Sequence, residues 1–392
     1  MLVGVVTGAR SDYGIYRPIL RTLVDDAFFN LHLYVTGMHL AREFGYTVDQ
    51  ILTDGFRVDE RVEMLLSSDT PEGLAKSMGL GTMGFAQVYA RCRPDLLIVL
   101  GDRFEMHAAA VAALPFKIPV AHIHGGESTE GAIDDSLRHS LTKMSHLHFV
   151  ATEEYARRVI QMGEEPWRVT VCGAPSLDNL LTIKLVEKRD LERKLGFPLN
   201  VAPLLVTYHS VTLEYEQAEW QVGELLAALG DEQRPIIFTL PNADTQGRSI
   251  AHHIREFVQR HPSARLIETL GTELYFSLMA QAAAMVGNSS SGIVEAPSFG
   301  LPVVNVGTRQ QGRVRATNVI DVSYDRRAVA AGIRKACSEE FRASLKGLQN
   351  PYGDGHAAET ISGRLKEVGL SERLIVKKFW TAKGMGLARS SQ

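Results

Sequence analysis

Short β-branched segments alternate with amphipathic segments through the first half of the chain, and the alternation begins again after residue 200. Such alternation predicts a doubly wound α/β fold with a parallel sheet. The predicted strands are 3–7, 31–35, 96–100, 120–123, 147–151 and 169–172 in the first half, and 203–208, 235–240, 265–269, 285–287, 302–306 and 318–322 in the second. The predicted fold class is therefore α/β, with two Rossmann-like domains whose parallel sheets face each other across a cleft.

The length of the chain also favours two domains, because 392 residues exceed what one hydrophobic core usually serves. We place the N-terminal domain at residues 1–178 and the C-terminal domain at 179–365. Near this boundary, residues 187–198 form a charged segment that ends in glycine and proline, as a linker region often does. Ligands of such folds bind near the carboxyl ends of the strands, so we expect the site between the domains.

Composition excludes several classes of partner. A net charge of -3 offers no overall field for nucleic acid or an anionic membrane, so an anionic ligand needs a local site. The apolar segment 108–121 is interrupted by Pro115 and Lys117 and is too short to span a membrane. The first six residues lack the basic region of a signal peptide and fit a core strand. The three cysteines have no CxxC spacing, which favours a reduced, cytoplasmic setting.

A dense polar cluster follows the predicted strand that ends near residue 121. His122-Ile-His-Gly-Gly-Glu127 supplies His122, His124 and Glu127, and Asp134 and Arg138 follow within a dozen residues. Asp134 and Arg138 are spaced i,i+4 and share one face if the segment is helical. Any one of these residues could belong to an ordinary surface helix, but the whole cluster at a strand end predicts a functional site.

Two glycine- and serine-containing turns are candidate anion sites. Gly8-Ala-Arg-Ser-Asp-Tyr-Gly14 lies between a strand and a helix, where free backbone N–H groups and Arg10 could bind an anion; a plain strand–helix turn is the alternative. Asn288-Ser-Ser-Ser-Gly292 precedes a predicted helix 293–298 and could cradle a diphosphate. Glu295 is either a capping partner or an acceptor for ribose hydroxyls.

Other polar residues also follow predicted strands. The first half contributes His39 and Asp102, and the second contributes His209, Asn242, Asp244, Arg309 and Arg313. The two arginines could bind phosphate or simply belong to a surface loop. Gly79-Leu-Gly-Thr-Met-Gly84 matches the dinucleotide pattern G-x-G-x-x-G, but a helical segment precedes it instead of a strand, so we reject a dinucleotide site. The histidines lack zinc-ligand spacing, and we expect no metal.

Together these motifs resemble the UDP-N-acetylglucosamine 2-epimerase family, and most closely its hydrolysing branch. The motifs that carry the resemblance are Gly8-Ala-Arg-Ser-Asp-Tyr-Gly14, Thr36-Gly-Met-His39, Gly101-Asp-Arg103, His122-Ile-His-Gly-Gly-Glu127, Arg138-His-Ser-Leu-Thr-Lys-Met144, Gly287-Asn-Ser-Ser-Ser-Gly292, Gly307-Thr-Arg-Gln310 and Asn350-Pro-Tyr-Gly-Asp-Gly355. Their order and joint presence over nearly the whole chain make the resemblance specific.

The resemblance implies a GT-B fold, with a C-terminal helix at about 366–392 that packs back on the first domain. It implies a hydrolase with no cofactor, which eliminates UDP to a 2-acetamidoglycal and then adds water with inversion at C2. The product from UDP-N-acetylglucosamine is N-acetylmannosamine, a precursor of sialic acids. The alternative substrate is UDP-N,N'-diacetylbacillosamine or its GDP analogue, which gives 2,4-diacetamido-2,4,6-trideoxymannose for legionaminic acid. A homodimer or homotetramer is also implied.

The resemblance further implies roles for individual residues. The nucleotide lies on the second domain: His209 and Ser289, Ser290 and Ser291 hold the diphosphate, Glu295 the ribose, and Arg10 and Arg309 the phosphate charge. Asp102, Glu127 and Asp134 are the acid–base candidates, and Arg138 orients Asp134 and lowers its pKa. His39 and His122 position the sugar or a proton.

Position 124 departs from the wider family, where many relatives have glutamate in place of His124. Either His124 or Glu127 then takes the role of base, and we favour Glu127. Two other classes of function stay open at this point. A GT-B glycosyltransferase would need an acceptor groove and no acid–base pair at C2, and a non-catalytic nucleotide-sugar sensor would tolerate loss of Asp134 or Glu127.

Overall fold

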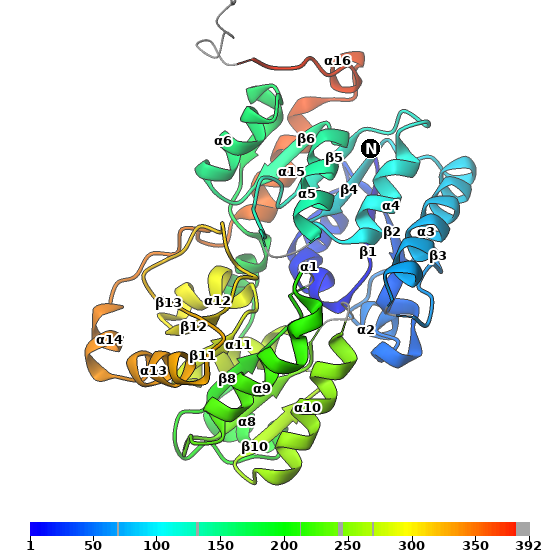
Figure 1. Ribbon diagram of the computed structural model, residues 1–392. Helices are drawn as coiled ribbons and strands as arrows, with labels where there is room; N and C mark the ends of the chain where they lie inside the picture. The colour runs from blue at the N-terminus through cyan, green and yellow to red at the C-terminus, as the bar shows by residue number, and fades with distance from the viewer. Residues whose placement is uncertain (69, 131–132, 212, 242–245, 269, 382–392) are drawn as a thin grey trace, which may run out of the picture.

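Two parallel β-sheets form the framework of the protein (Figure 1). The computed structural model describes residues 1–392 except 69, 131–132, 212, 242–245, 269 and 382–392. The first sheet has the strand order β3-β2-β1-β4-β5-β6-β7, and the second has the order β10-β9-β8-β11-β12-β13. Neighbouring strands pair in parallel in both sheets. The predicted fold class is confirmed.

The strands of the first sheet are β1 (Leu2–Thr7), β2 (Asn30–Thr36), β3 (Glu60–Val62), β4 (Leu96–Leu100), β5 (Val120–Ile123), β6 (Leu147–Val150) and β7 (Val169–Val171). Those of the second sheet are β8 (Leu204–Thr207), β9 (Ile236–Thr239), β10 (Ala264–Ile267), β11 (Ala284–Gly287), β12 (Val303–Val306) and β13 (Val319–Val322). Each predicted strand is present. The sequence pattern missed β3, a three-residue edge strand in which only Val62 is buried.

Helices cover both faces of each sheet. The α-helices are α1 (Arg10–Asp25), α2 (Val48–Thr53), α3 (Pro71–Arg91), α4 (Phe104–Ala113), α5 (Asp134–Met144), α6 (Glu153–Gln161), α7 (Asn179–Thr182), α8 (Lys188–Leu195), α9 (Ala218–Leu229), α10 (Gly247–Arg260), α11 (Gly271–Gln281), α12 (Ser291–Val294), α13 (Arg326–Ala336), α14 (Glu339–Ser344), α15 (Ala357–Val368) and α16 (Glu372–Ile375). None of the described helices is long and apolar enough to cross a membrane.

The packing explains why the central strand β4 of the first sheet is apolar throughout. Every residue of β4 is buried. On one face, α1 presents Tyr16, Ile19, Leu20 and Leu23, whose helical spacing forms a single stripe. On the other face, α3 and α4 supply a second buried cluster. A sheet covered on both faces requires runs of large apolar residues, which is the pattern that identified these strands.

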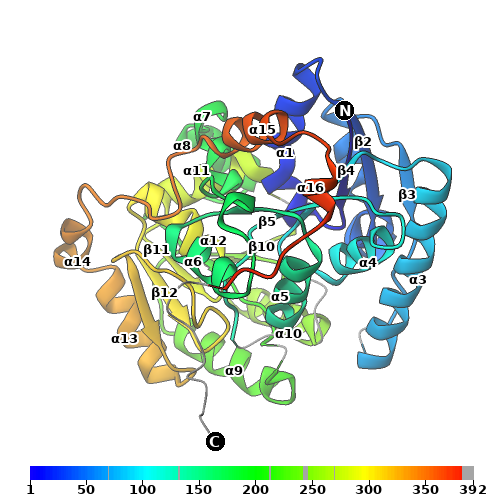
Figure 2. The ribbon, with the colours of Figure 1, turned by 90° about the horizontal axis from the view of Figure 1, so that it is seen from above.

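The chain crosses back to the first domain earlier than predicted. Helix α15 packs against α1, and its residues Ile361 and Leu365 belong to the first domain's core (Figure 2). Asp178 accepts hydrogen bonds from the backbone N–H groups of Ala357 (3.0 Å) and Ala358 (2.6 Å), which fixes the start of α15. The expected helix at about 366–392 is wrong, because α15 ends at Val368 and only the short α16 follows among the described residues.

Residues 371–381, which we call the C-terminal strap, run across the first domain beyond α15. The buried Arg168 side chain donates to the carbonyls of Arg373, Leu374 and Val376 and so binds the strap to the domain. The strap therefore belongs structurally to the N-terminal half of the protein.

Candidate active site

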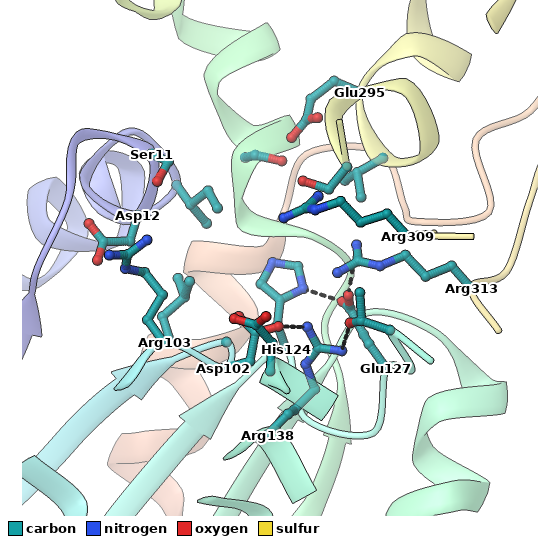
Figure 3. Close-up of a pocket in the computed structure, with 18 residues that line it drawn as sticks. Ser11, Asp12, Asp102, Arg103, His124, Glu127, Arg138, Glu295, Arg309 and Arg313 are labelled. Atoms are coloured by element: carbon teal, nitrogen blue, oxygen red, sulfur yellow. Dashed lines mark hydrogen bonds and ion pairs between the residues drawn. The ribbon is translucent and has the colours of Figure 1, made fainter. Parts of the chain in front are cut away.

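A cavity of about 150 Å³ lies where the carboxyl ends of the two sheets face each other (Figure 3). In each sheet the strand order reverses beside the first strand, between β1 and β4 and between β8 and β11, and such switch points are where α/β folds bind ligands. The residues that line the cavity are Ser11, Asp12, Ile15, Leu100, Gly101, Asp102, Arg103, His124, Glu127, Thr129, Asp134, Arg138, Ser176, Ser290, Val294, Glu295, Arg309 and Arg313.

The loop after β5 turns sharply and brings His124 to the cavity. His124 has φ 62° and Gly126 has φ 77°, both in the left-handed region. A Cβ at Gly126 would lie 2.6 Å from the carbonyl oxygen of Tyr155, so only glycine fits there. After this bend the Nδ1 atom of His124 lies 2.5 Å from Oε1 of Glu127. The polar cluster predicted from the sequence is thus built as a histidine–glutamate pair.

Glu127 also forms an ion pair across the cleft. Its Oε2 lies 3.1 Å from Nη1 of Arg313, which comes from the loop after β12 in the second domain. Burial raises the pKa of Glu127, but the charges of Arg313 and His124 more than reverse this effect and hold the pKa well below its usual value. Glu127 is therefore an anion between two nitrogen donors, and it joins the two domains.

Arg138 in α5 has partners that the helix spacing did not predict. The spacing pairs it with Asp134, whereas the structure pairs Arg138 with Asp102 in an ion pair and with Thr129 Oγ1 at 2.7 Å. Arg138 is fully buried. Asp134 lies one turn before it and lines the same cavity. Asp102, Asp134 and Arg138 are thus brought together, with Asp102 as the carboxylate that Arg138 orients.

The turn after β1 does not have the free amides that an anion site requires. The carboxylate of Asp12 accepts hydrogen bonds from the backbone N–H of Gly8 (2.9 Å) and of Ala9 (3.0 Å), so the protein itself occupies this turn. Arg10 lies outside the cavity and donates to the carbonyl of Glu268 in the second domain at 3.0 Å. The contact described for Arg10 joins the two domains, and its role toward phosphate stays a prediction.

His39 and His122 lie behind the cavity and do not line it. His122 donates from Nε2 to the carbonyl of Gly101 at 2.7 Å, and burial lowers its pKa to about 3, so the ring stays neutral. His39 is fully buried and contacts Thr7 Oγ1 at 3.0 Å and Thr47 Oγ1 at 2.7 Å. The expectation that these two histidines position the sugar or a proton stays a prediction, and in this structure both lie outside the cavity lining. His39 lies 3.8 Å from Asp12 at the start of α1, and His122 supports Gly101 beside Asp102 after β4.

The second domain positions its polar residues through Asn288. The side-chain amide of Asn288 accepts from the backbone N–H of His209 at 2.7 Å and donates to the backbone carbonyl of His209 at 2.8 Å. The backbone carbonyl of Asn288 accepts from Arg309 Nη1 at 3.2 Å and from Gln310 Nε2 at 2.8 Å. Arg309 is thereby held at the cavity. His209 is buried beside it and does not line the cavity; burial, aided by the charge of Arg309, keeps its pKa far below the usual value.

The serine turn after β11 reaches the cavity through Ser290. The following helix, α12, begins at Ser291, two residues earlier than predicted, and a 3-10 turn (Ala296–Phe299) replaces its second half. Gly292 serves packing, because a Cβ there would lie 2.8 Å from Val303 Cγ1. Glu295 lines the cavity, and burial raises its pKa while hydrogen bonds to Ser176 and Ser291 oppose the shift.

Sequence patterns missed several residues of the cavity. Asp12 and Arg103 stand inside motifs that we had quoted, yet neither was given a role; Arg103 is held by Glu105 at 2.8 Å. Ser176 lies far from the motifs and had no signal. Asn242 and Asp244 fall outside the described residues. Residues 79–84 lie within α3, which agrees with the rejection of a dinucleotide site.

The described residues contain no cluster of three or more histidine, cysteine, aspartate or glutamate side chains that could hold a metal ion. The site offers instead carboxylates, arginines, hydroxyls and one cavity-facing imidazole. The volume is below the roughly 300–1,000 Å³ of usual ligand sites.

Comparisons with known proteins agree with this architecture. The family model described as UDP-N-acetylglucosamine 2-epimerase matches residues 21–366. The chain is 38% identical over 372 residues to the UDP-N,N'-diacetylbacillosamine 2-epimerase (hydrolyzing) of Legionella pneumophila, which covers 95% of this chain and 97% of the relative. It is also 38% identical over 340 residues to the GDP/UDP-N,N'-diacetylbacillosamine 2-epimerase (hydrolyzing) of Campylobacter jejuni, covering 86% and 88% of the two chains.

Solved structures share the fold. The UDP-GlcNAc 2-epimerase from Neisseria meningitidis bound to UDP-GlcNAc superposes with a TM-score of 0.80 at 22% identity, covering 93% of this chain and 100% of that one. At this identity the likeness concerns the fold.

Proposed function

This chain belongs to the UDP-N-acetylglucosamine 2-epimerase family, and on that basis we propose that it is a hydrolysing 2-epimerase acting on a UDP-linked 2-acetamido sugar. One observation carries the proposal. The cavity between the domains gathers carboxylates, an imidazole and arginines at the facing ends of the two sheets, opposite the serine turn of the second domain.

The reaction has three requirements that these residues can meet. A base removes the C2 proton, cationic groups stabilise the departing diphosphate, and an acid delivers a proton to C2 from the opposite face. Arg309 and Arg313 line the cavity on the side of the second domain and suit the diphosphate. Asp102 and Asp134 lie together on the first domain and suit the acid.

The nucleotide would bind to the second domain. Ser290 reaches the cavity from the turn before α12, and Ser289 and Ser291 belong to the same turn. Glu295 is buried close by and can accept hydrogen bonds from ribose hydroxyls. His209, behind Arg309, would act on the diphosphate only through the residues around it.

Two sugars are candidates. The names of the relatives that are 38% identical favour UDP-N,N'-diacetylbacillosamine, with 2,4-diacetamido-2,4,6-trideoxymannose as the product. The family description favours UDP-N-acetylglucosamine, with N-acetylmannosamine as the product. The proposal also includes the homodimer or homotetramer that the family implies. It includes a cytoplasmic setting as well, which is consistent with the free thiols of Cys92, Cys172 and Cys337.

Incubation of the protein with each UDP sugar in D2O, followed by proton NMR, tests the function. We expect free UDP and a manno-configured sugar that carries deuterium at C2. A product that retains its C2 proton would refute elimination. If neither sugar is turned over while UDP is bound, the protein is a sensor instead.

Asp134→Asn tests the acid–base assignment. We expect UDP binding, measured by calorimetry, to stay close to that of the wild type while turnover falls about 100-fold or more, because general acid–base groups typically contribute about 10²–10⁴-fold. An equal loss of binding and turnover would make Asp134 a structural residue.

A further inference from the structure

We propose that His124 is the base that removes the C2 proton, and that Glu127 is a positioning residue that acts through His124. The inference rests on the proposed function and reverses the preference for Glu127 that the sequence suggested. It follows from how the two side chains are arranged in the cavity (Figure 3).

Both carboxylate oxygens of Glu127 are already engaged. Oε1 lies 2.5 Å from His124 Nδ1, and Oε2 lies 3.1 Å from Arg313 Nη1. The side chain is only 2% exposed. To take a proton from a substrate, Glu127 would have to use the second lone pair of an oxygen that already lies against His124 or Arg313 in a buried site. A carboxylate held as an anion by two donors is also a weak base.

His124 has the free atom that Glu127 lacks. The carboxylate at Nδ1 favours the tautomer that carries its hydrogen on Nδ1, and in that neutral tautomer the lone pair lies on Nε2. Among the described residues Nε2 has no hydrogen-bond partner, and the ring lines the cavity (Figure 3). A carboxylate that orients an imidazole and stabilises its protonated form is a recurrent arrangement in general-base catalysis.

The backbone supports the same assignment. His124 adopts φ 62°, in the left-handed region that is unfavourable for a residue other than glycine. The amide of His124 is fixed by a 2.9 Å hydrogen bond to the carbonyl of Phe149 in the neighbouring strand. The fold thus holds a strained residue in place, and the result is an imidazole directed at the switch point of the first sheet.

The step balances as follows. The Nε2 lone pair takes the proton from C2, and the C2–H electron pair becomes the C1=C2 double bond. The C1–O bond breaks and its electron pair leaves with the diphosphate of UDP beside Arg309 and Arg313. A carboxylic acid group of the first domain, for which Asp134 is the candidate, then delivers a proton to C2 from the other face while water adds its oxygen to C1 and releases a proton. The imidazolium and the carboxylate return to their starting states by proton exchange with water.

The test is a double-mutant cycle on turnover, with imidazole rescue. His124→Asn is the first variant because asparagine tolerates a positive φ, and His124→Gly is the second because glycine leaves the most room for added imidazole. Each is combined with Glu127→Gln. UDP binding, measured by calorimetry, shows for every variant that the second domain and the cleft are intact.

We expect either His124 variant to lose about 100-fold or more in kcat with little change in KM, and imidazole to restore part of the turnover of His124→Gly. Glu127→Gln, which keeps the ring, is expected to lose less. The kcat of each double variant should lie within about threefold of the kcat of the matching His124 variant, because Glu127 acts through the imidazole, which both variants lack.

If Glu127 is itself the base, Glu127→Gln will abolish turnover, the losses in the double variants will multiply, and imidazole will rescue nothing. Any of these results overturns the proposal.

The matched control is His252→Ala, which removes a histidine from an exposed pair with Glu256 (3.3 Å) on α10 and should leave kcat unchanged. The wild type separates this proposal from the proposed function. If the wild type gives no product with deuterium at C2, the proposed function fails. If it gives that product, the variants test only the role of His124.

Discussion

Glu164→Gln is expected to release the C-terminal strap from the first domain. Glu164 has no solvent exposure, and its carboxylate accepts from Lys143 Nζ (2.5 Å), His148 Nε2 (3.0 Å) and Lys377 Nζ (2.8 Å). Lys377 belongs to the strap and also donates to the carbonyls of Lys143 and Ser145. The buried carboxylate is therefore the charge that holds the strap in place.

The size of the effect follows from the pKa of Glu164. Burial raises this pKa, but the hydrogen bond and charge of His148 and the hydrogen bonds from the two lysines bring it from 4.5 down to about 2. A shift of this size corresponds to about 3 kcal/mol in favour of the ionised form. The carboxylate is fully buried, so solvent screening does not reduce the figure much. Loss of the charge should destabilise the folded state by up to about 3 kcal/mol in total. Strap opening breaks only the charged hydrogen bond from Lys377, about 1.5 kcal/mol, because Lys143 and His148 stay beside Glu164.

The pH dependence has a definite sign. Because the folded pKa lies below the unfolded value, the stabilisation is fully present above pH 4.5 and is lost as the pH falls toward 2. The wild type and Glu164→Gln differ in their free energy of unfolding, and this difference should shrink by about 2 kcal/mol as the pH falls from 5 to 3.

Hydrogen exchange of the strap measures this opening directly. At pH 7 the Trp380 amide, which donates to the carbonyl of Gly163 at 2.8 Å, should exchange about 10-fold faster in Glu164→Gln than in the wild type. The control is Glu154→Gln, which breaks an exposed pair with Arg158 (3.3 Å) and should leave the exchange of the strap unchanged. Exchange of Trp380 at the wild-type rate in Glu164→Gln would refute the reasoning.

Two further predictions concern the cleft. Arg309→Ala should weaken UDP binding more than Arg10→Ala, because Arg309 lines the cavity while Arg10 donates to the carbonyl of Glu268. Calorimetry measures the UDP affinity of both variants. A greater loss in Arg10→Ala would make Arg10 the phosphate ligand. Gly126→Ala should destabilise the protein by about 1–3 kcal/mol, because its φ is 77° and a Cβ would lie 2.6 Å from the Tyr155 carbonyl. Thermal unfolding measures this loss, and a melting temperature equal to that of the wild type would show that the loop can relax.

The sequence was sufficient for the strands and for the place of the cavity. Buried strands such as β4 are uninterrupted apolar runs, so their limits are visible in the sequence. Polar residues directly after such runs must lie at the carboxyl edge of the sheet, and this located Asp102, His124 and Glu127. The edge strand β3, where only Val62 is buried, had no such signal.

Pairings between distant residues were beyond the sequence pattern. The helix spacing joined Arg138 to Asp134, but tertiary packing brought Asp102 from the end of β4 to the same guanidinium. The Gly8 turn had the composition of an anion site, yet Asp12 in the next helix occupies its amides. A histidine at a strand end has the same appearance in sequence whether it lines the cavity, as His124 does, or supports it from behind, as His122 does.

Domain closure and the candidate base are linked through Arg313. Glu127 belongs to the first domain and Arg313 to the second, so any separation of the two domains breaks this ion pair. With the domains apart, Glu127 would keep its contact with His124 and lose its contact with Arg313. Closure would bring Arg313 back to Glu127. Closure therefore completes the set of contacts that fixes the carboxylate, and the carboxylate fixes the tautomer of His124. Proton removal from C2 is then confined to the closed cleft, where a 2-acetamidoglycal would be held for the addition of water instead of being lost to solvent.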